Sequence, residues 1–341
     1  MKKNKNIMKI GLLIPSPIIS PTGGVKIQAE MWCDGFNMLG HEGVLINYWK
    51  DLDWKSYDAI IILGFGGSFR LWMKGLSWNN KKIAVAPIID PHVNKYIYKF
   101  LVKYWGSQKF LGLTSRFHDL YLGTRKAQIF FTRSNEETEY LSFSCDIPKD
   151  KIYQIPLSVR FQPLDVMPEK ENFCFHASRL YAANKNVARL IQAAIKYKFE
   201  LFLGGVLNGK EEEDWLYSQI EGHENIHYIG LVSDDELKDW YRRAKVFALP
   251  SLSEGVGMVA LEAAGYGSEI VLTNVGAPKE YWDGRARLVD PLSVDDIGKA
   301  IIECLEGEHK KQPELMKFIQ REYSIKSCTE KIVEALQTMN D

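Results

Sequence analysis

The residues best suited to chemistry lie in one glycine-rich stretch, 250–265. Its turn carries Glu254, and the second turn of the helix expected to follow carries Glu262. Gly255 and Gly257 would let backbone N–H groups approach a ligand closely, and the start of the helix attracts anions. Eight residues at ~1.5 Å each separate the two carboxylates by roughly 12 Å along the helix axis, on nearly the same side. Two carboxylates around an anion site suit a sugar nucleotide, although a surface turn and a solvated helix face would give the same pattern.

The same stretch resembles the donor-binding motif of retaining glycosyltransferases of family four (glycosyl transferases group 1), which have the GT-B fold. The family pattern E-G-x-G-x-x-x-x-E is matched by Glu254, Gly255, Gly257 and Glu262, and residues 272–280 look like its continuation. The resemblance implies that Glu254 holds the hexose hydroxyls of a nucleotide-diphosphate sugar. It implies that Glu262 holds the ribose hydroxyls.

Further residues complete the expected donor site, and two depart from the family pattern. The resemblance adds these positions: Gly230, Leu231, Val232, Val256, Met258 and Val259. Backbone groups at 230–232 are expected to recognise the base. Val256 stands where an aromatic residue is common, and Glu269 stands where the family usually has proline. Neither departure removes a polar contact, so both bear on substrate detail more than on activity.

Two cations upstream are the expected diphosphate ligands. The segment 175–187 resembles the family element G-R-L…K-N/G, with Ser178 in place of the glycine. By this resemblance Arg179 and Lys185 contact the donor diphosphate. Arginine offers a planar fork to phosphate oxygens, and lysine adds a compact charge. Cations aimed at a leaving diphosphate would stabilise the negative charge that develops as the sugar–phosphate bond breaks.

The first half of the chain offers weaker signals. Gly23 and Gly24 open the first expected helix, and in the family such a pair lets the helix start face the donor phosphates. His92 follows the fourth expected strand and is our candidate for acceptor chemistry, because family members often place a histidine near the reacting sugar. His118 is the alternate candidate. A core or surface role fits either histidine equally well.

The sequence favours no metal and no cofactor. Asp51-Leu-Asp53 spells the metal-holding D-x-D of a different glycosyltransferase fold, but it lies in an early acidic loop and reads as solvated. His223 and His227 form the one H-x-x-x-H pair, in a polar loop. The GT-B layout that the resemblance implies needs no metal, because cations and helix starts neutralise the diphosphate.

Composition sets the compartment and excludes several classes. No apolar run approaches 18 residues, and the start of the chain lacks the apolar core of a secretory signal. Five cysteines without a C-x-x-C pair favour reduced thiols in a cytoplasmic protein. Residues 1–160 contain 22 Lys/Arg against 13 Asp/Glu, a balance of +9, and the remainder contains 21 against 30, a balance of −9. No dense basic cluster with stacking aromatics indicates a nucleic-acid partner.

Alternating strands and helices predict an α/β protein with two Rossmann-like, doubly wound parallel-sheet domains facing across a cleft. We expect an acceptor domain at 1–158, a linker at 159–171, a donor domain at 172–320 and a closing helix at 321–341 that crosses back to the first domain. The expected strands are 8–15, 44–48, 59–63, 83–89, 110–114, 127–132, 173–177, 199–204, 226–229 and 246–249.

The function expected from these residues is metal-independent transfer of a hexose, with retention, from a donor such as UDP- or GDP-hexose to a carbohydrate or lipid-linked acceptor, in polysaccharide or glycoconjugate synthesis. A sugar-nucleotide epimerase of the same architecture is one alternative, since it would convert the donor without an acceptor. A non-catalytic nucleotide-sugar-binding protein is another. The sequence does not name the base, the hexose or the acceptor.

One helix suggests a membrane partner. Lys95, Lys99 and Lys103 recur every four residues along one face of it, surrounded by aromatic residues. This face could contact anionic headgroups on the inner side of a membrane, or a lipid-linked acceptor. The alternative is an ordinary solvated lysine face above a buried aromatic one.

Overall fold

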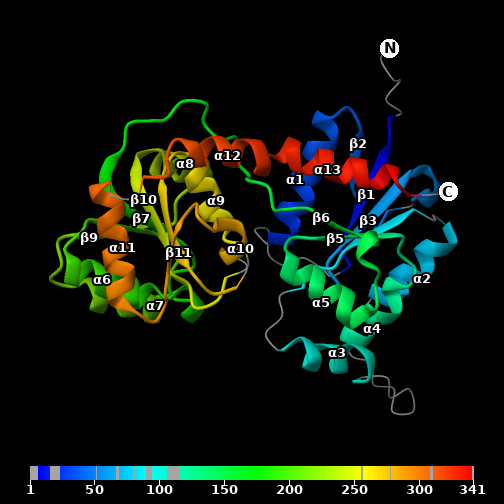
Figure 1. Cartoon of the computed structure of the whole chain (residues 1–341), viewed down its shortest axis with the longest axis horizontal. Coiled ribbons are helices and arrows are strands. Elements are labelled where there is room, and N and C mark those ends of the chain that lie inside the picture. Colours follow the sequence, from blue (N-terminus) through cyan, green and yellow to red (C-terminus); the bar gives the residue numbers. More distant parts are fainter. Residues whose placement is uncertain are drawn as a thin grey trace. The chain divides into compact units, whose positions relative to one another are not determined.

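Two compact units make up the chain (Figure 1). The computed structural model describes residues 7–15, 24–50, 52–66, 69–79, 82–89, 94–105, 116–254, 256–276, 278–307 and 310–339. Unit 1 comprises Met1–Ser158 with Ile325–Asp341, and unit 2 comprises Val159–Ser324. The segment 159–171, which we expected to be a linker, therefore falls within unit 2.

Unit 1 is built on a six-stranded sheet of order β2-β1-β3-β4-β5-β6, with parallel pairing throughout. Its strands are β1 (Lys9–Leu13), β2 (Glu42–Leu45), β3 (Ala59–Leu63), β4 (Ile83–Ala86), β5 (Ile129–Thr132) and β6 (Ile152–Gln154). Its helices are α1 (Gly24–Met38), α2 (Phe69–Asn79), α3 (Lys95–Lys103), α4 (Arg116–Thr124), α5 (Asn135–Cys145) and α13 (Ile325–Gln337).

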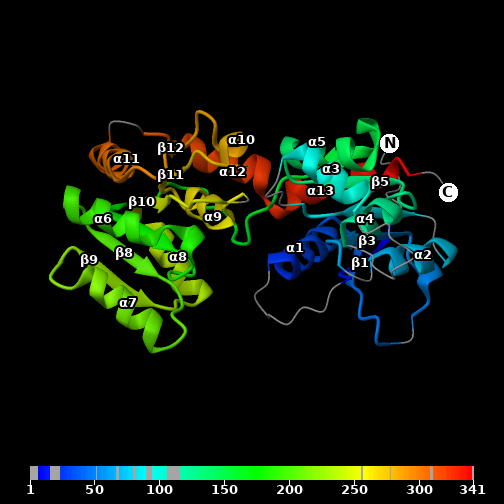
Figure 2. The ribbon, with the colours of Figure 1, turned by 90° about the horizontal axis from the view of Figure 1, so that it is seen from below.

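The two faces of this sheet have separate cores because side chains alternate along each strand. Ile61 and Leu63 of β3 pack with α1 and α13, whereas Ile60 and Ile62 pack with α2 to α5. Helices therefore cover both faces, as the views in Figures 1 and 2 show.

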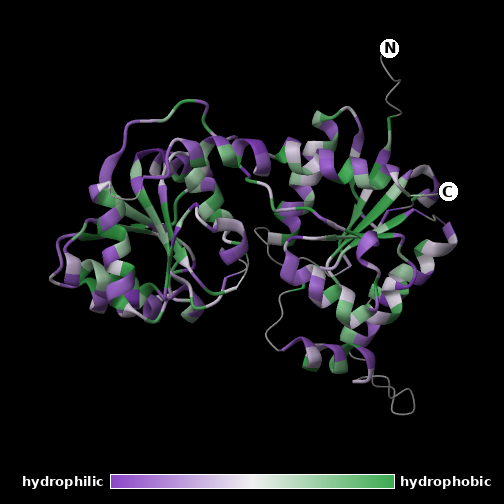
Figure 3. Cartoon of the chain, viewed as in Figure 1, coloured by the Kyte–Doolittle hydropathy of each residue, from purple (hydrophilic) through white to green (hydrophobic). Residues whose placement is uncertain are grey.

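Unit 2 repeats this arrangement with the strand order β12-β11-β10-β7-β8-β9, again all parallel. Its strands are β7 (Glu171–Ala177), β8 (Leu201–Gly204), β9 (Ile226–Gly230), β10 (Ala244–Leu249), β11 (Glu269–Thr273) and β12 (Arg287–Val289). Its helices are α6 (Val187–Tyr197), α7 (Lys210–Ile220), α8 (Asp234–Arg243), α9 (Met258–Gly265), α10 (Pro278–Trp282), α11 (Val294–Glu306) and α12 (Glu314–Tyr323). Figure 3 shows that the strands of both sheets are predominantly hydrophobic.

The strand order of unit 2 identifies where a ligand should bind. From β7 the chain proceeds outward through β8 and β9, and then returns to the other side of β7 with β10. This reversal is a topological switch point, and ligands of such sheets bind at the carboxyl ends of the strands beside it. The loops that follow β7 and β10 carry Arg179, Lys185 and Glu254 among the expected donor ligands.

The predicted fold class is confirmed, with differences in detail. Helices α2 and α5 were not foreseen, and the expected strand 110–114 lies outside the described residues. The chain after 320 forms the end of α12 and then a separate helix, α13, which belongs to unit 1. Among the described residues no helix combines the length and apolarity needed to span a membrane.

The departure at Glu269 has a structural role. Glu269 is the first residue of β11 and is almost fully buried. Its carboxylate accepts hydrogen bonds from the backbone N–H groups of Lys311 (2.7 Å) and Gln312 (3.0 Å). Burial raises the pKa of Glu269, and these two hydrogen bonds oppose that rise. The side chain therefore fastens the segment before α12 to the start of β11.

A buried histidine joins the two central strands of unit 2. His176 of β7 is fully buried, and its Nδ1 lies 2.7 Å from the carbonyl oxygen of Ala248 in β10. A carbonyl only accepts, so Nδ1 carries the proton and Nε2 accepts from the Ser178 hydroxyl at 2.7 Å. Burial lowers the pKa of His176 to about 4. The ring is therefore neutral in the folded protein.

This histidine predicts a loss of stability in weak acid. Between pH 6.5 and about 4 the unfolded chain binds a proton that folded His176 does not, so stability falls as the pH falls through that window. The full effect is at most ~3 kcal/mol. Urea unfolding of the wild type and His176→Gln at several pH values should show a steeper decline for the wild type. Parallel curves would contradict the assignment.

A glycine sets how closely α1 and α13 approach in unit 1. A Cβ atom on Gly35 would lie 2.0 Å from Oγ1 of Thr329, which is fully buried. We expect Gly35→Ala to force these helices apart and to cost ~1–3 kcal/mol of unfolding free energy. The control is Gly75→Ala in α2, where a Cβ meets nothing within 4 Å. It should be neutral or stabilising by up to ~1 kcal/mol. Equal denaturation midpoints for the two variants would refute the packing argument.

Candidate functional site

The loops after β7 and β10 are fastened to each other. Leu252 donates its backbone N–H to the carbonyl of Asn184 at 2.8 Å. The side-chain amide of Asn186 donates to the carbonyls of Pro250 (2.9 Å) and Pro291 (2.7 Å). Asn186 has φ +60°, a left-handed conformation that asparagine tolerates better than most residues. One buried side chain therefore holds three loops together at the carboxyl ends of the sheet.

Lys185 and Glu254 meet across these loops. The Lys185 ammonium lies 2.7 Å from Oε2 of Glu254, and the Ser251 hydroxyl donates to the same oxygen at 3.1 Å. The lysine side chain is 23% exposed and the glutamate side chain 14% exposed, so a ligand can reach both. An ammonium has three donors, and among the described residues one of them is used, by Glu254. The structure therefore brings together two of the expected site residues. Ser251, which the sequence did not single out, joins them.

Arg179 lies on the loop after β7 without joining this pair. Its side chain is exposed, and among the described residues no hydrogen bond or ion pair involves its guanidinium. Its loop is held by its neighbour Ser178, which donates its N–H to Gly204 and its hydroxyl to His176. The loop is therefore fixed while the cation remains available to a ligand.

The glycine turn before α9 ends in a residue with left-handed backbone conformation. Gly257 has φ +74° and stands at the N-cap of α9, whose first residues are Met258 and Val259. A Cβ there would make only ordinary contacts, so the positive φ and not the space calls for glycine. Val256 is buried, and Gly255 lies outside the described residues. The first N–H groups of α9 have no partner within the helix and can bind an anion.

Glu262 is held in an internal ion pair that the sequence did not indicate. Its side chain is fully buried and receives both arms of the Arg160 guanidinium, Nε at 2.6 Å and a terminal nitrogen at 3.1 Å. The Tyr241 hydroxyl donates to it at 3.3 Å, and Arg160 also contacts Asp234 at 3.2 Å. Burial raises the pKa of Glu262, while the bonds from Arg160 oppose that rise. Sequence reasoning missed Arg160, because no local pattern links residues so far apart in the chain.

The expected base-recognition segment ends the edge strand of the sheet. Gly230 closes β9 with φ +78°, and Gly205 donates its N–H to the Gly230 carbonyl at 2.9 Å. Leu231 is 74% exposed and Val232 is half-buried. In the sheet order β9 is two strands from β7, so this segment lies on the same carboxyl edge as the ion pair.

Fewer of the unit 1 candidates can be placed. Gly24 begins α1 and is exposed, whereas Gly23 and His92 lie outside the described residues. His118 is buried in α4 with its Nδ1 3.1 Å from the carbonyl of Val102, which indicates a packing role.

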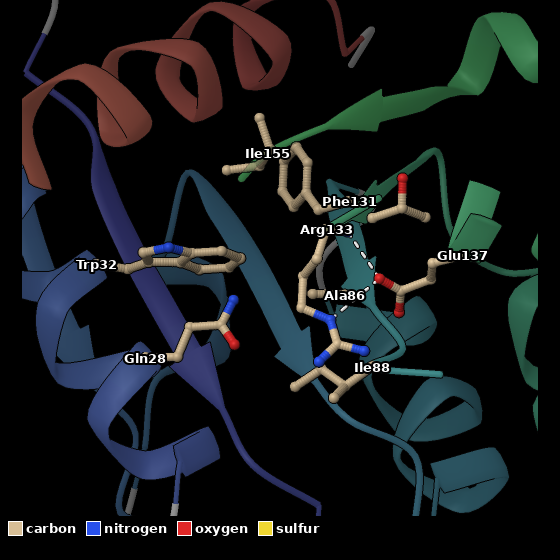
Figure 4. Close-up of a pocket in the computed structure, with 9 residues that line it drawn as sticks. Gln28, Trp32, Ala86, Ile88, Phe131, Arg133, Glu137 and Ile155 are labelled. Atoms are coloured by element: carbon tan, nitrogen blue, oxygen red, sulfur yellow. Dashed lines mark hydrogen bonds and ion pairs between the residues drawn. The ribbon is translucent and has the colours of Figure 1, made fainter. Parts of the chain in front are cut away.

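A narrow pocket lies at the carboxyl ends of β4 and β5 in unit 1 (Figure 4). Its walls include Gln28 and Trp32 of α1, and it has no room for a water molecule. The Glu137 carboxylate is buried there and accepts the N–H of Ile89 at 2.6 Å and two N–H groups of Arg133 at 2.7 and 3.1 Å. Glu137 thereby fixes the backbone at Ile89, the last described residue before His92, which itself lies outside the described residues.

Asp53 of the D-x-D sequence and His227 of the H-x-x-x-H sequence each contact a neighbouring residue. Asp53 caps a short 3-10 helix by accepting the N–H of Lys55 at 3.1 Å, while Asp51 lies outside the described residues. His227 pairs with Glu200 at 2.9 Å. In the part of the chain that the structure describes, no three His, Cys, Asp or Glu side chains gather as metal ligands would.

Comparison with known proteins gives this site a family. Residues 164–323 match the family model described as glycosyl transferases group 1. The chain is 24% identical over 233 residues to the O-antigen chain mannosyltransferase B of Escherichia coli, covering 62% of this chain and 61% of that protein. It is 44% identical over 117 residues to a D-inositol 3-phosphate glycosyltransferase of Arthrobacter sp., covering 28% of each. The chain thus spans less than two thirds of the length of these curated relatives.

Solved structures share the whole fold. Sucrose-phosphate synthase from Thermosynechococcus elongatus superposes with a TM-score of 0.69 at 14% identity, over 96% of this chain and 98% of that one. HepE from Anabaena, in complex with UDP and glucose, superposes with a TM-score of 0.67 at 15% identity, over 97% and 100%. At such identities the likeness concerns the fold alone. Residues 164–323, which carry the Lys185–Glu254 pair, therefore resemble the glycosyl transferases group 1, and the two units have the GT-B fold.

Proposed function

We propose that this protein transfers a hexose, with retention of anomeric configuration, from a nucleotide-diphosphate sugar to a saccharide or lipid-linked acceptor. The observation that carries this proposal is the Lys185–Glu254 pair at the switch point of unit 2, with Arg179 exposed on the same loop as Lys185. A cation, a carboxylate and a glycine-capped helix start on one edge of a sheet offer ligands for each part of such a donor.

The proposed roles follow from the charges. Arg179, Lys185 and the first N–H groups of α9 bind the diphosphate and stabilise it as the sugar–phosphate bond breaks and its electrons pass to the phosphate oxygen. Glu254 accepts hydrogen bonds from the hexose hydroxyls, and Lys185 keeps this carboxylate oriented until the donor arrives. No metal is part of this proposal, since the cations take that role. His92 stays our candidate for a group that faces the acceptor.

The role of Glu262 needs a modification. Its two oxygens offer about four lone-pair directions, and Arg160 and Tyr241 occupy three of them. One direction remains for a ribose hydroxyl, so two hydroxyls would bind only if Arg160 shifted. We therefore propose that Arg160 and Glu262 act together at the ribose end, with Arg160 as a positioning residue.

The setting of the reaction is also a proposal. We place the protein in the cytoplasm, at the inner face of a membrane when its acceptor is lipid-linked, in polysaccharide or glycoconjugate synthesis. The mannosyltransferase named above, by its name, acts in the assembly of an O-antigen chain, which is a polymer of this kind.

The diphosphate assignment predicts the effect of removing either cation. Arg179→Ala and Lys185→Ala should each reduce transfer by ~10²–10³-fold, since each removes a charge that stabilises the leaving group. Both side chains reach solvent, so the thermal midpoint should change little. Transfer is measured with UDP- and GDP-hexoses, after thermal-shift screening identifies the nucleotide that binds. Lys196→Ala is the control, because this lysine pairs with Asp295 on the surface of the same unit. Full turnover by Arg179→Ala or Lys185→Ala would remove the assignment.

The same donor separates the alternative functions. Incubation of the wild type with donor alone would yield a second sugar nucleotide if the protein were an epimerase. A protein that binds the donor tightly but neither hydrolyses nor transfers it with any saccharide or lipid-linked acceptor would be a binding protein. The proposal requires sugar transfer with release of the nucleoside diphosphate.

The Arg160–Glu262 pair predicts strong coupling in stability. Arg160→Ala leaves a buried carboxylate without its cation and should cost ~3–5 kcal/mol of unfolding free energy. Arg160→Ala with Glu262→Gln should recover most of this loss, because the remaining group is neutral. The control is Arg243→Ala, whose exposed partner Glu171 makes the pair worth at most ~1 kcal/mol. Additive effects of the two substitutions in urea unfolding would contradict the coupling.

A binding measurement distinguishes the ribose role from a structural one. Glu262→Gln should weaken binding of the nucleoside diphosphate but leave binding of inorganic pyrophosphate unchanged in titration calorimetry. Equal weakening of both ligands would indicate that Glu262 only supports the fold of α9.

A further inference from the structure

Helix α3 exposes a continuous aromatic and aliphatic surface. The exposed fractions are Tyr96 65%, Ile97 53%, Phe100 52%, Tyr104 61% and Trp105 61%. At 3.6 residues per turn these positions and the half-buried Leu101 cover about half of the helix circumference. A helix on the surface of a water-exposed protein normally presents polar residues there. The exposed half of α3 is therefore apolar and aromatic, where a solvated helix face would be polar.

The lysines of α3 do not form the outward surface that the sequence suggested. Lys99 lies 3.9 Å from the Asp146 carboxylate, and Lys103 forms a closer ion pair with it. The Lys99 ammonium also lies 4.0 Å from the ring centre of Phe143, and the Lys95 ammonium lies 5.6 Å from it. The lysines thus run along the side of α3 that borders α5. They lie along one margin of the exposed aromatic surface, which we call the lysine rim.

The orientation of α3 is fixed by its buried side. Tyr98 and Val102 enter the core of unit 1, where the Tyr98 ring meets Phe117 and Tyr140 edge-on at 5.5 Å each. The N-terminus of the helix is capped by Asn94, which accepts the N–H of Tyr96 at 2.9 Å. Because these contacts set the rotation of the helix, the exposed aromatic residues cannot turn inward without breaking the core.

The charge of this region identifies the class of partner. Residues 94–146, which include the bordering helix α5 and Asp146, contain eight Lys/Arg and five Asp/Glu, a balance of +3. Pairing this surface with a second copy of itself would bring two basic regions together, which opposes self-association. Tyrosine and tryptophan prefer the interface between hydrocarbon and headgroups, and lysines beside them attract anionic lipids. Exposed aromatics with a basic rim fit a negatively charged bilayer.

We propose that the exposed half of α3, from Tyr96 to Trp105, inserts into the headgroup region of a bilayer that contains anionic lipids. At ~1.5 Å per residue the nine-residue helix is about 14 Å long, which suits a helix lying in the interface and not one that spans it. Phe100 and Trp105 enter the acyl boundary. Lys95 contacts phosphates there, while Lys99 and Lys103 keep their pairing with Asp146. The surface would hold the enzyme where a lipid-linked acceptor is found, yet its binding does not depend on the proposed reaction.

Vesicle binding by the full chain tests this surface. The wild type should cosediment with mixed phosphatidylcholine/phosphatidylglycerol vesicles at least ~10-fold better than with phosphatidylcholine alone, and less well as salt increases. Phe100→Ser with Trp105→Ser should reduce binding to the anionic vesicles by ~10-fold or more. The matched control is Leu71→Ser with Trp78→Ser in α2, two residues of the same unit that are more exposed than Phe100 and Trp105. This control should bind as the wild type does.

Several outcomes would overturn the proposal. They are absence of wild-type binding to anionic vesicles, equal loss in the α2 control, or wild-type binding by the α3 variant. Self-association of the wild type that the α3 variant abolishes would assign the surface to a protein contact instead. Thermal midpoints and nucleoside-diphosphate binding are measured for every variant, and both should be unchanged. Because nucleotide binding is read separately, failure of the membrane surface is distinguishable from failure of the proposed function.

Discussion

The candidate site depends on one constraint, the direct pairing of β7 with β10 in a parallel sheet. Parallel pairing places the ends of both strands on one edge, so loops that are far apart in the sequence become neighbours. Asn186 then connects three such loops with a single amide, at the carbonyls of Pro250 and Pro291. The positions of Lys185 and Glu254 are consequences of this arrangement. A register shift between the strands would separate them.

Much of the site could be predicted because its signals are local. The glycine turn, the helix start and the two cations each follow a predicted strand, and the left-handed φ of Gly257 is the reason for a glycine there. The doubly wound order follows from alternating elements. Helix α2 was missed because the exposed Leu71 and Trp78 obscure the helical spacing of its buried Phe69, Met73 and Leu76. Helix α5 was missed because polar residues such as Glu137 and Ser144 occupy its buried side.

The remaining features could not be predicted because they depend on tertiary neighbours. Arg160 and Glu262 are joined only through the fold, and a motif read along the chain gives no sign of the pair. The lysine spacing of α3 was visible, but which side faces water depends on Asp146 and Phe143 of another segment. In both places the residue types were visible in the sequence, while their partners and orientation required the packed structure.

The two glutamates of the motif thus sit in opposite environments, and the contrast bears on how a donor would bind. Glu262, in the second turn of α9, is buried and forms an ion pair with Arg160 that holds the helix in place. Glu254 is half-buried and pairs with Lys185 at the other end of the turn. The turn between them is therefore held at both ends before any ligand arrives. Backbone N–H groups that already point at a developing negative charge need no reorganisation during the reaction. A turn that is fixed before the ligand binds therefore favours stabilisation of the transition state. An internal ion pair at Glu262 is thus compatible with a role in catalysis, because it fixes the amides that would meet the diphosphate.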